Sequence, residues 1–189
     1  MARWEPNAPE RLAQAALDLF TERGYENTTV IDIAQRAGLG KTTFFRYFQD
    51  KREVLFGRGA VNELITNAIA AAPDDATPLE AVAHALDAVG REVFTPARRE
   101  FTARRRAVIA AHSELREREA LKNLGLIASM TTALEQRGVP DLTARVAANL
   151  GALASAIADE RWAQATDGDD FSKLARQALD DVQASTSLC

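Results

Sequence analysis

The sequence predicts an all-α protein, in which an N-terminal three-helix head with a helix-turn-helix precedes a C-terminal helical bundle. Three observations lead to this fold class. Apolar residues make up 47% of the chain and are mostly Ala and Leu, whereas Gly and Pro number only 10 and 6, a mixture that favours helices over sheets. Apolar positions recur at intervals of three and four residues, and helix-capping residues precede them. About nine helices and no convincing strand are expected.

The first helix is well signalled and is expected from about Pro9 to Arg23. Asn7 can cap its start, and Gly24 can adopt the positive φ that often follows a helix. The side chains of its buried face stand at helical spacing: Leu12, Ala15, Ala16, Leu19 and Phe20.

Two short helices joined by a tight turn are expected next. The second helix opens at Thr29, which forms a variant capping box with Asp32, and it ends at Gly38, which suits a left-handed turn. The third covers about Lys41 to Phe48. Two short helices joined by a Gly-containing turn are the helix-turn-helix pattern.

The remaining elements are expected to be helices as well. A fourth helix, with a capping box at Asp50 to Glu53, is expected to run unbroken to about Ala72. Later helices are signalled at Thr77-Pro78, Thr95-Pro96, Ser113, Asp141 and Phe171 to Val182. The chain is therefore divided into a head over residues 1–56 and a body over residues 57–189.

Composition excludes several classes of function. Cys189 is the only cysteine, so an internal disulfide is impossible and a thiolate metal cluster is not expected. His84 and His112 belong to no ligand-spaced motif, and Glu80 with His84 is expected to be a surface pair rather than a metal site. We therefore expect no metal, no cofactor and no catalytic residues. No apolar run approaches the roughly 20 residues of a membrane span, and residues 1–6 carry no export signal, which indicates the cytoplasm.

The net charge of −4 conceals a mild asymmetry. Residues 1–59 hold nine Lys/Arg and eight Asp/Glu, whereas the rest of the chain holds 14 and 19. The basic residues of the first part gather around the helix-turn-helix, so the charge permits DNA binding without proving it.

The third helix carries the candidate DNA-reading residues. On a helix, Phe44 and Phe48 share one face and can pack inward, whereas Phe45 must stand out, where it suits thymine methyl groups in a major groove. Lys41, Thr42 and Thr43 occupy the N-terminal end of this helix, the end that enters the groove in helix-turn-helix proteins. The alternative is an ordinary amphipathic aromatic helix of a core with solvated charges.

The stretch Thr28 to Lys51, which reads TTVIDIAQRAGLGKTTFFRYFQDK, closely resembles the DNA-binding signature of TetR/AcrR-family regulators. The resemblance covers about residues 8–56. It implies a dimeric regulator, usually a repressor, that binds a pseudo-palindromic operator and is released by a small molecule. With Arg46 of the same helix added, the positions that match the family's DNA contacts give this candidate interface: Thr29, Lys41, Thr42, Thr43, Phe45, Arg46, Tyr47 and Lys51.

Three positions depart from the family pattern. Gly40 stands where Ser is common, so a hydroxyl cap is missing, although Gly is tolerated at an N-cap. Thr42 stands where Gly is frequent and can add a contact. Phe45 replaces a frequent Tyr, which removes a hydroxyl that can bond a phosphate.

Beyond residue 60 the resemblance fades, and in the family the middle helices enclose the ligand. Candidate pocket residues for a small apolar or amphipathic effector are Leu86, Phe94, Phe101, Arg105, Ile109, Leu124, Ile127 and Met130. Each can equally be ordinary core. The runs Arg98-Arg99 and 104–106 either meet an anionic effector, such as an acyl thioester, or form a solvated face.

The resemblance also implies that the last two long helices pair across a twofold axis. Residues 142–165 are rich in small and aliphatic side chains, which suit a close isologous contact between subunits. The alternative is that they pack only within one subunit. The candidates are Ala144, Val146, Ala147, Leu150, Ala154, Ala156, Ile157 and Ala158.

Two other functions have to be compared with the sequence. A helical-bundle enzyme would need a nucleophile, paired carboxylates or a metal cluster, and the sequence contains no Glu-x-x-His pair, phosphate loop or His/Cys cluster. A DNA-binding protein without an effector would not need so large and apolar a body. The sequence-specific, ligand-responsive regulator is the function that the residues favour.

Overall fold

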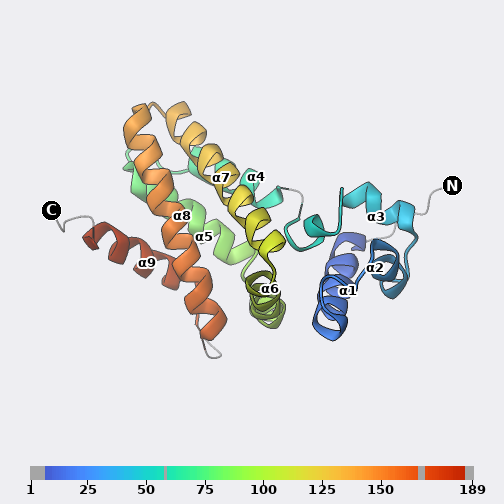
Figure 1. Ribbon diagram of the computed structural model, residues 1–189. Coiled ribbons are helices and arrows are strands. Elements are labelled where there is room, and N and C mark those ends of the chain that lie inside the picture. The colour runs from blue at the N-terminus through green and yellow to red at the C-terminus, as the bar shows by residue number, and fades with distance from the viewer. Residues whose placement is uncertain (1–6, 58, 166–168, 186–189) are drawn as a thin grey trace. The chain divides into compact units, whose positions relative to one another are not determined.

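The structure is a computed structural model that describes residues 7–57, 59–165 and 169–185 (Figure 1). The described residues form nine α-helices and two short 3-10 helices, with no strand among them, which confirms the predicted fold class. In chain order the elements are α1 (Ala8–Arg23), α2 (Val30–Arg36), α3 (Lys41–Tyr47), η1 (Arg52–Leu55), α4 (Ala60–Ala70), α5 (Pro78–Glu92), η2 (Pro96–Arg98), α6 (Arg99–Ala111), α7 (Ser113–Gln136), α8 (Asp141–Gln164) and α9 (Phe171–Ser185).

Two compact units make up the chain. The head unit comprises the residues up to 59 together with residues 101–120, and the body unit comprises the remaining residues. The expected division instead assigned residues 101–120 to the body. They join the head unit because Val108, Ile109 and Leu115 are buried in the same apolar cluster as the inner face of α1.

Most of the expected helix signals are present in the structure. Gly24 and Gly38 have φ values of 83° and 67°, as the turns after α1 and α2 require. Capping boxes at Thr29 and Thr77 start α2 and α5. The expected cap at Asn7 is wrong, because this residue has a φ of 63° and its side chain makes no capping hydrogen bond. N-cap side chains usually stand on extended backbone.

The expected long fourth helix is also wrong in its length. It is divided into η1 and α4, because Gly57 and Gly59 have φ values of 66° and 84° and do not continue a helix. Asp50 nevertheless caps the first piece, since its Oδ1 accepts hydrogen bonds from the backbone N–H groups of Arg52 (2.8 Å) and Glu53 (3.1 Å).

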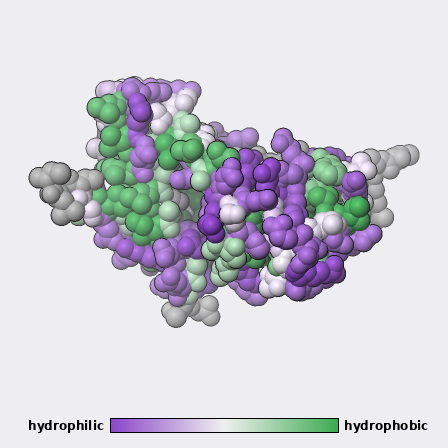
Figure 2. Space-filling model, viewed as in Figure 1, coloured by the Kyte–Doolittle hydropathy of each residue, from purple (hydrophilic) through white to green (hydrophobic). Residues whose placement is uncertain are grey.

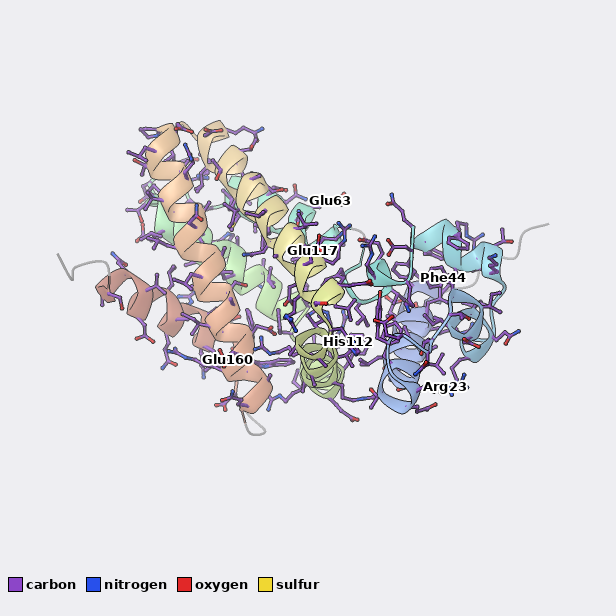
Figure 3. The ribbon with its side chains drawn as sticks, in the orientation of Figure 1. Arg23, Phe44, Glu63, His112, Glu117 and Glu160 are labelled. Carbon is purple, nitrogen blue, oxygen red and sulfur yellow. The ribbon has the colours of Figure 1, made fainter. Side chains whose placement is uncertain are left out.

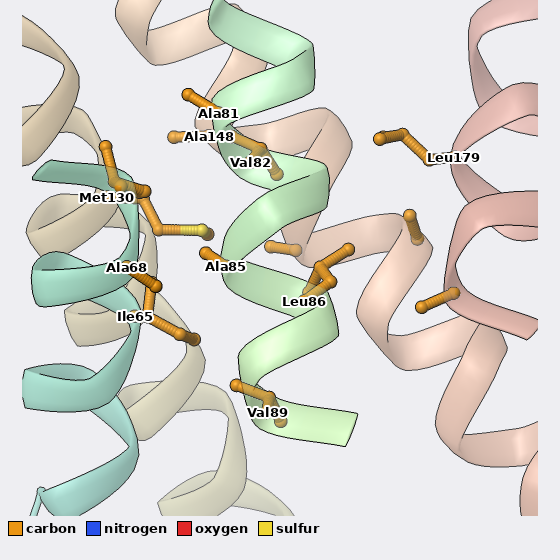
Figure 4. Packing of buried hydrophobic residues seen from close by; sticks show 14 of the residues in the cluster. Ile65, Ala68, Ala81, Val82, Ala85, Leu86, Val89, Met130, Ala148 and Leu179 are labelled. Atoms are coloured by element: carbon orange, nitrogen blue, oxygen red, sulfur yellow. The ribbon is translucent and has the colours of Figure 1, made fainter. Parts of the chain in front are cut away.

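The centre of the body unit is α5, which contacts α4, α8 and α9. Figure 4 shows Val82, Leu86 and Val89 of α5 between Met130 of α7 and Leu179 of α9. Alanine is the commonest residue of this core. Because alanine side chains are short, the helix backbones approach each other closely.

This close approach predicts the effect of Gly151→Ala. A Cβ atom added at Gly151 would lie 2.4 Å from Cγ1 of Val82, so α8 and α5 would have to separate. We expect a loss of about 1–3 kcal/mol in the free energy of unfolding. Gly125→Ala in α7 is the matched control, because nothing lies within 4 Å of its added Cβ. The control should stabilise the helix by up to about 1 kcal/mol, and equal effects of the two substitutions in urea unfolding would contradict the close approach.

Candidate nucleic-acid interface

One side of α3 is built into the head and the other faces solvent. Phe44 is fully buried, and its ring centroid lies 5.5 Å from that of Phe48, which is also buried. Figure 3 labels Phe44 on α3 of the head unit. Phe45 remains 46% exposed, and its ring lies edge-on to Phe44. The sequence-based expectation that these neighbouring phenylalanines point in different directions is therefore confirmed.

Polar and cationic side chains surround the exposed Phe45. Lys41 and Thr42, in the first turn of α3, are exposed, whereas Thr43 is half-buried. The Lys41 ammonium lies 5.8 Å from the centroid of the Phe45 ring. In the last turn, the exposed Arg46 guanidinium lies 5.0 Å from the ring centroid of Tyr47. All eight candidate residues are exposed or half-buried, and six of them belong to α3: Lys41, Thr42, Thr43, Phe45, Arg46 and Tyr47.

The angle between α2 and the rest of the head is held by two arginines. Arg11 of α1 donates a hydrogen bond to the backbone oxygen of Ala37 at the end of α2. Arg36 of α2 makes a two-pronged pair with Glu22 of α1, at 2.9 and 2.7 Å. Bidentate arginine pairs restrict geometry as well as adding energy, so α2 presents a fixed support for α3.

Thr29 forms the start of α2 in a closed hydrogen-bonded ring. Its Oγ1 accepts from the Asp32 backbone N–H at 3.2 Å and donates to Asp32 Oδ2 at 2.6 Å. Its own backbone N–H donates to the same carboxylate at 2.8 Å. The hydroxyl proton of Thr29 is therefore already used inside the protein, and capping is the role that its geometry gives it.

This ring changes the acidity of Asp32. The hydroxyl of Thr29 first, and its backbone N–H second, hold the pKa of the Asp32 carboxyl below its ordinary value of 3.8. Since the folded-state pKa is lowered, the ring stabilises the fold above about pH 4, and the stabilisation is lost as the pH falls. We expect Thr29→Ala to raise the Asp32 pKa towards 3.8 and Thr29→Ser to keep it low, in a carboxyl ¹³C NMR titration. An unchanged pKa in Thr29→Ala would contradict the assignment.

Lys51 lies outside α3, in the connection before η1. Its Nζ donates to the backbone oxygen of Tyr25 at 2.8 Å and lies 3.9 Å from the centroid of the Tyr25 ring. The resemblance gives Lys51 a role in DNA contact but says nothing of Tyr25. The contact between Tyr25 and Lys51 could not be expected from the sequence, because no spacing rule links positions 25 and 51.

The arginine run of α6 also has a role that the sequence did not predict. Arg104 pairs with Asp18 of α1 at 2.8 Å, and Arg105 donates to the backbone oxygen of Leu55 at 2.7 Å. Arg118 of α7 pairs with the buried Glu53 of η1. These side chains attach residues 101–120 to the head unit, so Arg104 and Arg105 bind partners within the head instead of forming a purely solvated face.

The eight predicted pocket residues are distributed over both units. Leu86 and Met130 are buried in the body core, Phe94 and Ile127 are partly buried against it, and Leu124 is 62% exposed. The other three, Phe101, Arg105 and Ile109, belong to the head unit. Two clefts are described, and neither includes any of the eight residues. The buried members pack in the apolar cores of their own units: Leu86 and Met130 in the body, and Ile109 in the head.

The expected pair between Glu80 and His84 does not form. Glu80 accepts a hydrogen bond from the Thr77 backbone N–H at 2.7 Å, and the Nδ1 atom of His84 lies 2.9 Å from the backbone oxygen of Ala68. Both residues line a cleft of about 360 Å³ in the body unit, together with Asp87. In the part of the chain that the structure describes, no His, Cys, Asp and Glu side chains group as metal ligands, and no helix has the length and apolarity to cross a membrane.

Relatives of known type share the helix-turn-helix. The sequence model of the bacterial regulatory proteins of the tetR family matches residues 12–57. The chain is 40% identical over 81 residues to the HTH-type transcriptional regulator TcmR of Streptomyces glaucescens, a match of 42% of this chain and 36% of that protein. It is 39% identical over 46 residues to the HTH-type transcriptional regulator HbdR of Aromatoleum, a match of 24% and 20%. The matches thus span about a third or less of these relatives, which are named as regulators and not as enzymes.

Solved structures resemble the chain over most of its length. NalD of Pseudomonas aeruginosa, described as the secondary repressor of the MexAB-OprM multidrug efflux pump, has a TM-score of 0.59 at 20% identity over 94% of this chain and 96% of its own. FadR of Thermus thermophilus, a repressor solved in complex with lauroyl-CoA, has a TM-score of 0.51 at 22% identity over 93% of each chain. Residues 12–57 therefore match the DNA-binding segment of the bacterial regulatory proteins of the tetR family, and the chain shares the fold of these solved structures.

Proposed function

We propose that this protein is a cytoplasmic, sequence-specific DNA-binding repressor that a small apolar or amphipathic molecule releases from its operator. The observation that carries the proposal is the outer side of α3, where Phe45 is 46% exposed beside Lys41 while Phe44 is fully buried. On the outer side of a helix-turn-helix, an exposed ring can meet thymine methyl groups in the major groove, and the neighbouring ammonium can meet base edges or phosphates. FadR and NalD, which resemble the chain in fold, are both described as repressors, and this supports the sign of regulation.

In this proposal the N-terminal end of α3 enters the major groove. Lys41 and Thr42 contact base edges or phosphates there, and Phe45 packs against thymine methyl groups. Arg46, Tyr47 and Lys51 contact the backbone on either side of the groove. Thr43 adds a contact at the start of α3, and Thr29, whose hydroxyl is used in the capping ring, positions the start of α2.

The effector site is proposed in the body unit. Leu86, Phe94, Ile127 and Met130 are the predicted pocket residues that lie in or against its core. Since they pack against their neighbours, an effector enters by separating helices that are in contact in the present structure. Phe101, Arg105, Ile109 and Leu124 are less suited to the same site, because three of them belong to the head unit and Leu124 is exposed.

Trp162 is placed to report effector binding. It is 1% exposed, and its ring centroid lies 5.2 Å from that of Phe94. Only one other tryptophan, Trp4, occurs in the sequence, so Trp4→Phe isolates the signal. A compound that enters beside Phe94 should change Trp162 fluorescence at the same concentration at which it releases DNA.

The homodimer is proposed to form through the exposed side of α8. Four alanines that the sequence offered for this contact, Ala144, Ala147, Ala154 and Ala158, are buried within the body core and pack inside one subunit. A different set of α8 residues is exposed at successive intervals of four and three, the spacing of one helix face. We call this set the α8 stripe, and it consists of Leu142, Val146, Asn149, Leu153 and Ala156.

Helices α7 and α8 expose large apolar side chains, whereas α9 exposes mainly polar ones. Leu142, Val146 and Leu153 of α8 are 71%, 50% and 52% exposed, and Leu121 and Leu124 of α7 are also exposed. Hydrophobic surface is visible where α7 and α8 lie in Figure 2. The exposed residues of α9 are mostly charged or amide side chains, among them Lys173, Arg176, Gln177, Asp180 and Asp181. The α8 stripe is thus the better candidate for an apolar contact.

The stripe can pair with its own copy in an antiparallel arrangement. A twofold axis near Asn149 sets Val146 against Leu153 of the partner subunit and Leu142 against Ala156 of the partner subunit. An isologous contact of this kind is the commonest in homodimers. Asn149 at the centre supplies an amide pair that fixes the register, as a single polar residue does in coiled coils.

The test is a gel shift of the protein on its own promoter region, with an excess of unrelated DNA and moderate salt to suppress phosphate-driven binding. A retained band, a footprint with two half-sites about one helical turn apart, and its release by a compound that changes Trp162 fluorescence would support the proposal. Absence of a specific site in genome-wide selection with ligand-stripped protein would refute it.

A further inference from the structure

The ammonium group of Lys51 is held in one place by Tyr25. One of its three N–H donors bonds the Tyr25 backbone oxygen at 2.8 Å, and the charge lies 3.9 Å from the centroid of the Tyr25 ring. A cation over an aromatic face within about 6 Å is attracted by the ring. Lys51 therefore has two attachments to one residue, and two of its donors remain for other partners.

Tyr25 is itself fixed from a distant part of the sequence. It is 1% exposed, its ring packs edge-on against Phe20 of α1, and its hydroxyl donates to Glu114 Oε2 at 3.3 Å. The ring of His112 lies 5.3 Å away, at the junction of α6 and α7 that Figure 3 labels. Burial first, and Glu114 second, raise the pKa of Tyr25 well above its ordinary value. The hydroxyl thus stays protonated and remains a donor to Glu114 at physiological pH.

We propose that Tyr25 is a positioning residue for DNA binding: it holds the Lys51 ammonium ready for a backbone phosphate, and the α6–α7 junction holds Tyr25. The inference rests on the proposed function, because the phosphate contact of Lys51 belongs to that proposal. A free lysine side chain loses much rotamer freedom when it binds a phosphate. Because Tyr25 already restricts the Lys51 side chain in the free protein, less side-chain entropy is lost when DNA binds, which is the general benefit of preorganisation.

A merely structural role for Tyr25 makes different predictions. If Tyr25 only fills the head core, its replacement lowers stability and leaves the number of phosphate contacts unchanged. If it positions Lys51, its replacement also lowers the salt dependence of DNA binding. The salt dependence counts phosphate contacts, with a slope of about −0.9 for each one on double-stranded DNA.

The contact is tested first without DNA. The sequence contains four lysines, so selective ¹³C-lysine labelling gives four assignable Cε–Hε signals, and Lys51→Arg identifies the one from Lys51. Because this ammonium lies over a ring face, the Lys51 signal should be shifted upfield in the wild type and in Tyr25→Phe. It should return to the ordinary lysine position in Tyr25→Leu. An unshifted Lys51 signal in the wild type would overturn the inference without any need for a folded variant.

The second test uses operator DNA over a series of salt concentrations. Lys51→Ala should weaken binding roughly three- to tenfold and reduce the magnitude of the slope by about 0.9. Tyr25→Leu should reduce the slope in the same direction, and the double variant should equal Lys51→Ala alone, because coupled residues are not additive. Leu12→Ala is the matched control, since Leu12 of α1 is as fully buried in the head core as Tyr25. It should lower the melting temperature with an unchanged slope.

The outcomes separate this inference from the proposed function. Additive effects of Tyr25→Leu and Lys51→Ala, or an unchanged slope in Tyr25→Leu, would overturn the positioning role while operator binding stands. If the wild type finds no operator, the proposed function fails, and so does the phosphate role of Lys51. The NMR signal alone would then report whether Tyr25 holds the ammonium.

Discussion

Replacing Val146 and Leu153 by aspartate is expected to turn the protein into a monomer and to weaken operator binding by about a hundredfold or more. Two carboxylates within the α8 stripe would face the same groups of a second copy, and burying unpaired charge in an apolar contact is strongly unfavourable. A monomer binds one half-site at a time. It loses the effective concentration that linking two heads provides, which is worth a factor of about 10²–10⁴.

Light scattering after size-exclusion chromatography gives the mass, and the gel shift gives the affinity. The control carries Gln136→Asp in α7 and Gln177→Asp in α9, which are exposed positions outside the stripe and add the same charge. It should remain dimeric and bind DNA as the wild type does. A dimeric Val146→Asp/Leu153→Asp variant would show that the copies meet on another surface.

Phe45→Ala is expected to lower operator affinity by about five- to thirtyfold, since losing one specific base contact costs about 1–2 kcal/mol. The free energy of unfolding should change by less than about 1 kcal/mol, because the side chain is half exposed. Phe44→Ala should instead act mainly on the free energy of unfolding. That side chain is fully buried, and its truncation should cost about 3–5 kcal/mol of stability.

The thymine contact itself can be tested by changing the DNA. Operators in which uracil replaces thymine lack only the C5-methyl group. The wild type should bind them more weakly, and Phe45→Ala should bind both versions equally, because the apolar partner of the methyl group is gone. Equal binding of both operators by the wild type would remove Phe45 from base recognition, even if Phe45→Ala weakened binding.

Local signals in the sequence predicted the helix-turn-helix well. The capping box at Thr29, the positive φ of Gly38 and the opposite directions of Phe44 and Phe45 depend only on neighbours within one or two helical turns. Such features follow from the chain's own geometry, with little influence from the rest of the fold. The break at Gly57 and Gly59 was also local, and the pair of glycines was the signal that could have revealed it.

The parts that the sequence did not predict depend on contacts between distant residues. Helical periodicity identifies Ile109 as a buried position but cannot tell whether α1 or α5 covers it. The same limit applies to Arg104 and Arg105, whose partners Asp18 and Leu55 lie 86 and 50 positions away. The attachment of Lys51 to Tyr25 spans 26 positions. The pattern of charges along α6 therefore could not show whether its arginines bind an effector or form ion pairs and hydrogen bonds within the head unit.

The single helix α7 gives Leu115 to the head core and Met130 to the body core. The head unit is therefore interrupted in the sequence, with residues 60–100 of the body between its two parts. Domains usually fold from the N-terminus during synthesis, but on the ribosome this head still lacks Val108, Ile109 and Leu115 when its first 59 residues have emerged. Its core is completed only after residue 115 has left the exit tunnel. The nascent DNA-reading unit thus stays immature until residues 60–100 of the body have also been synthesised.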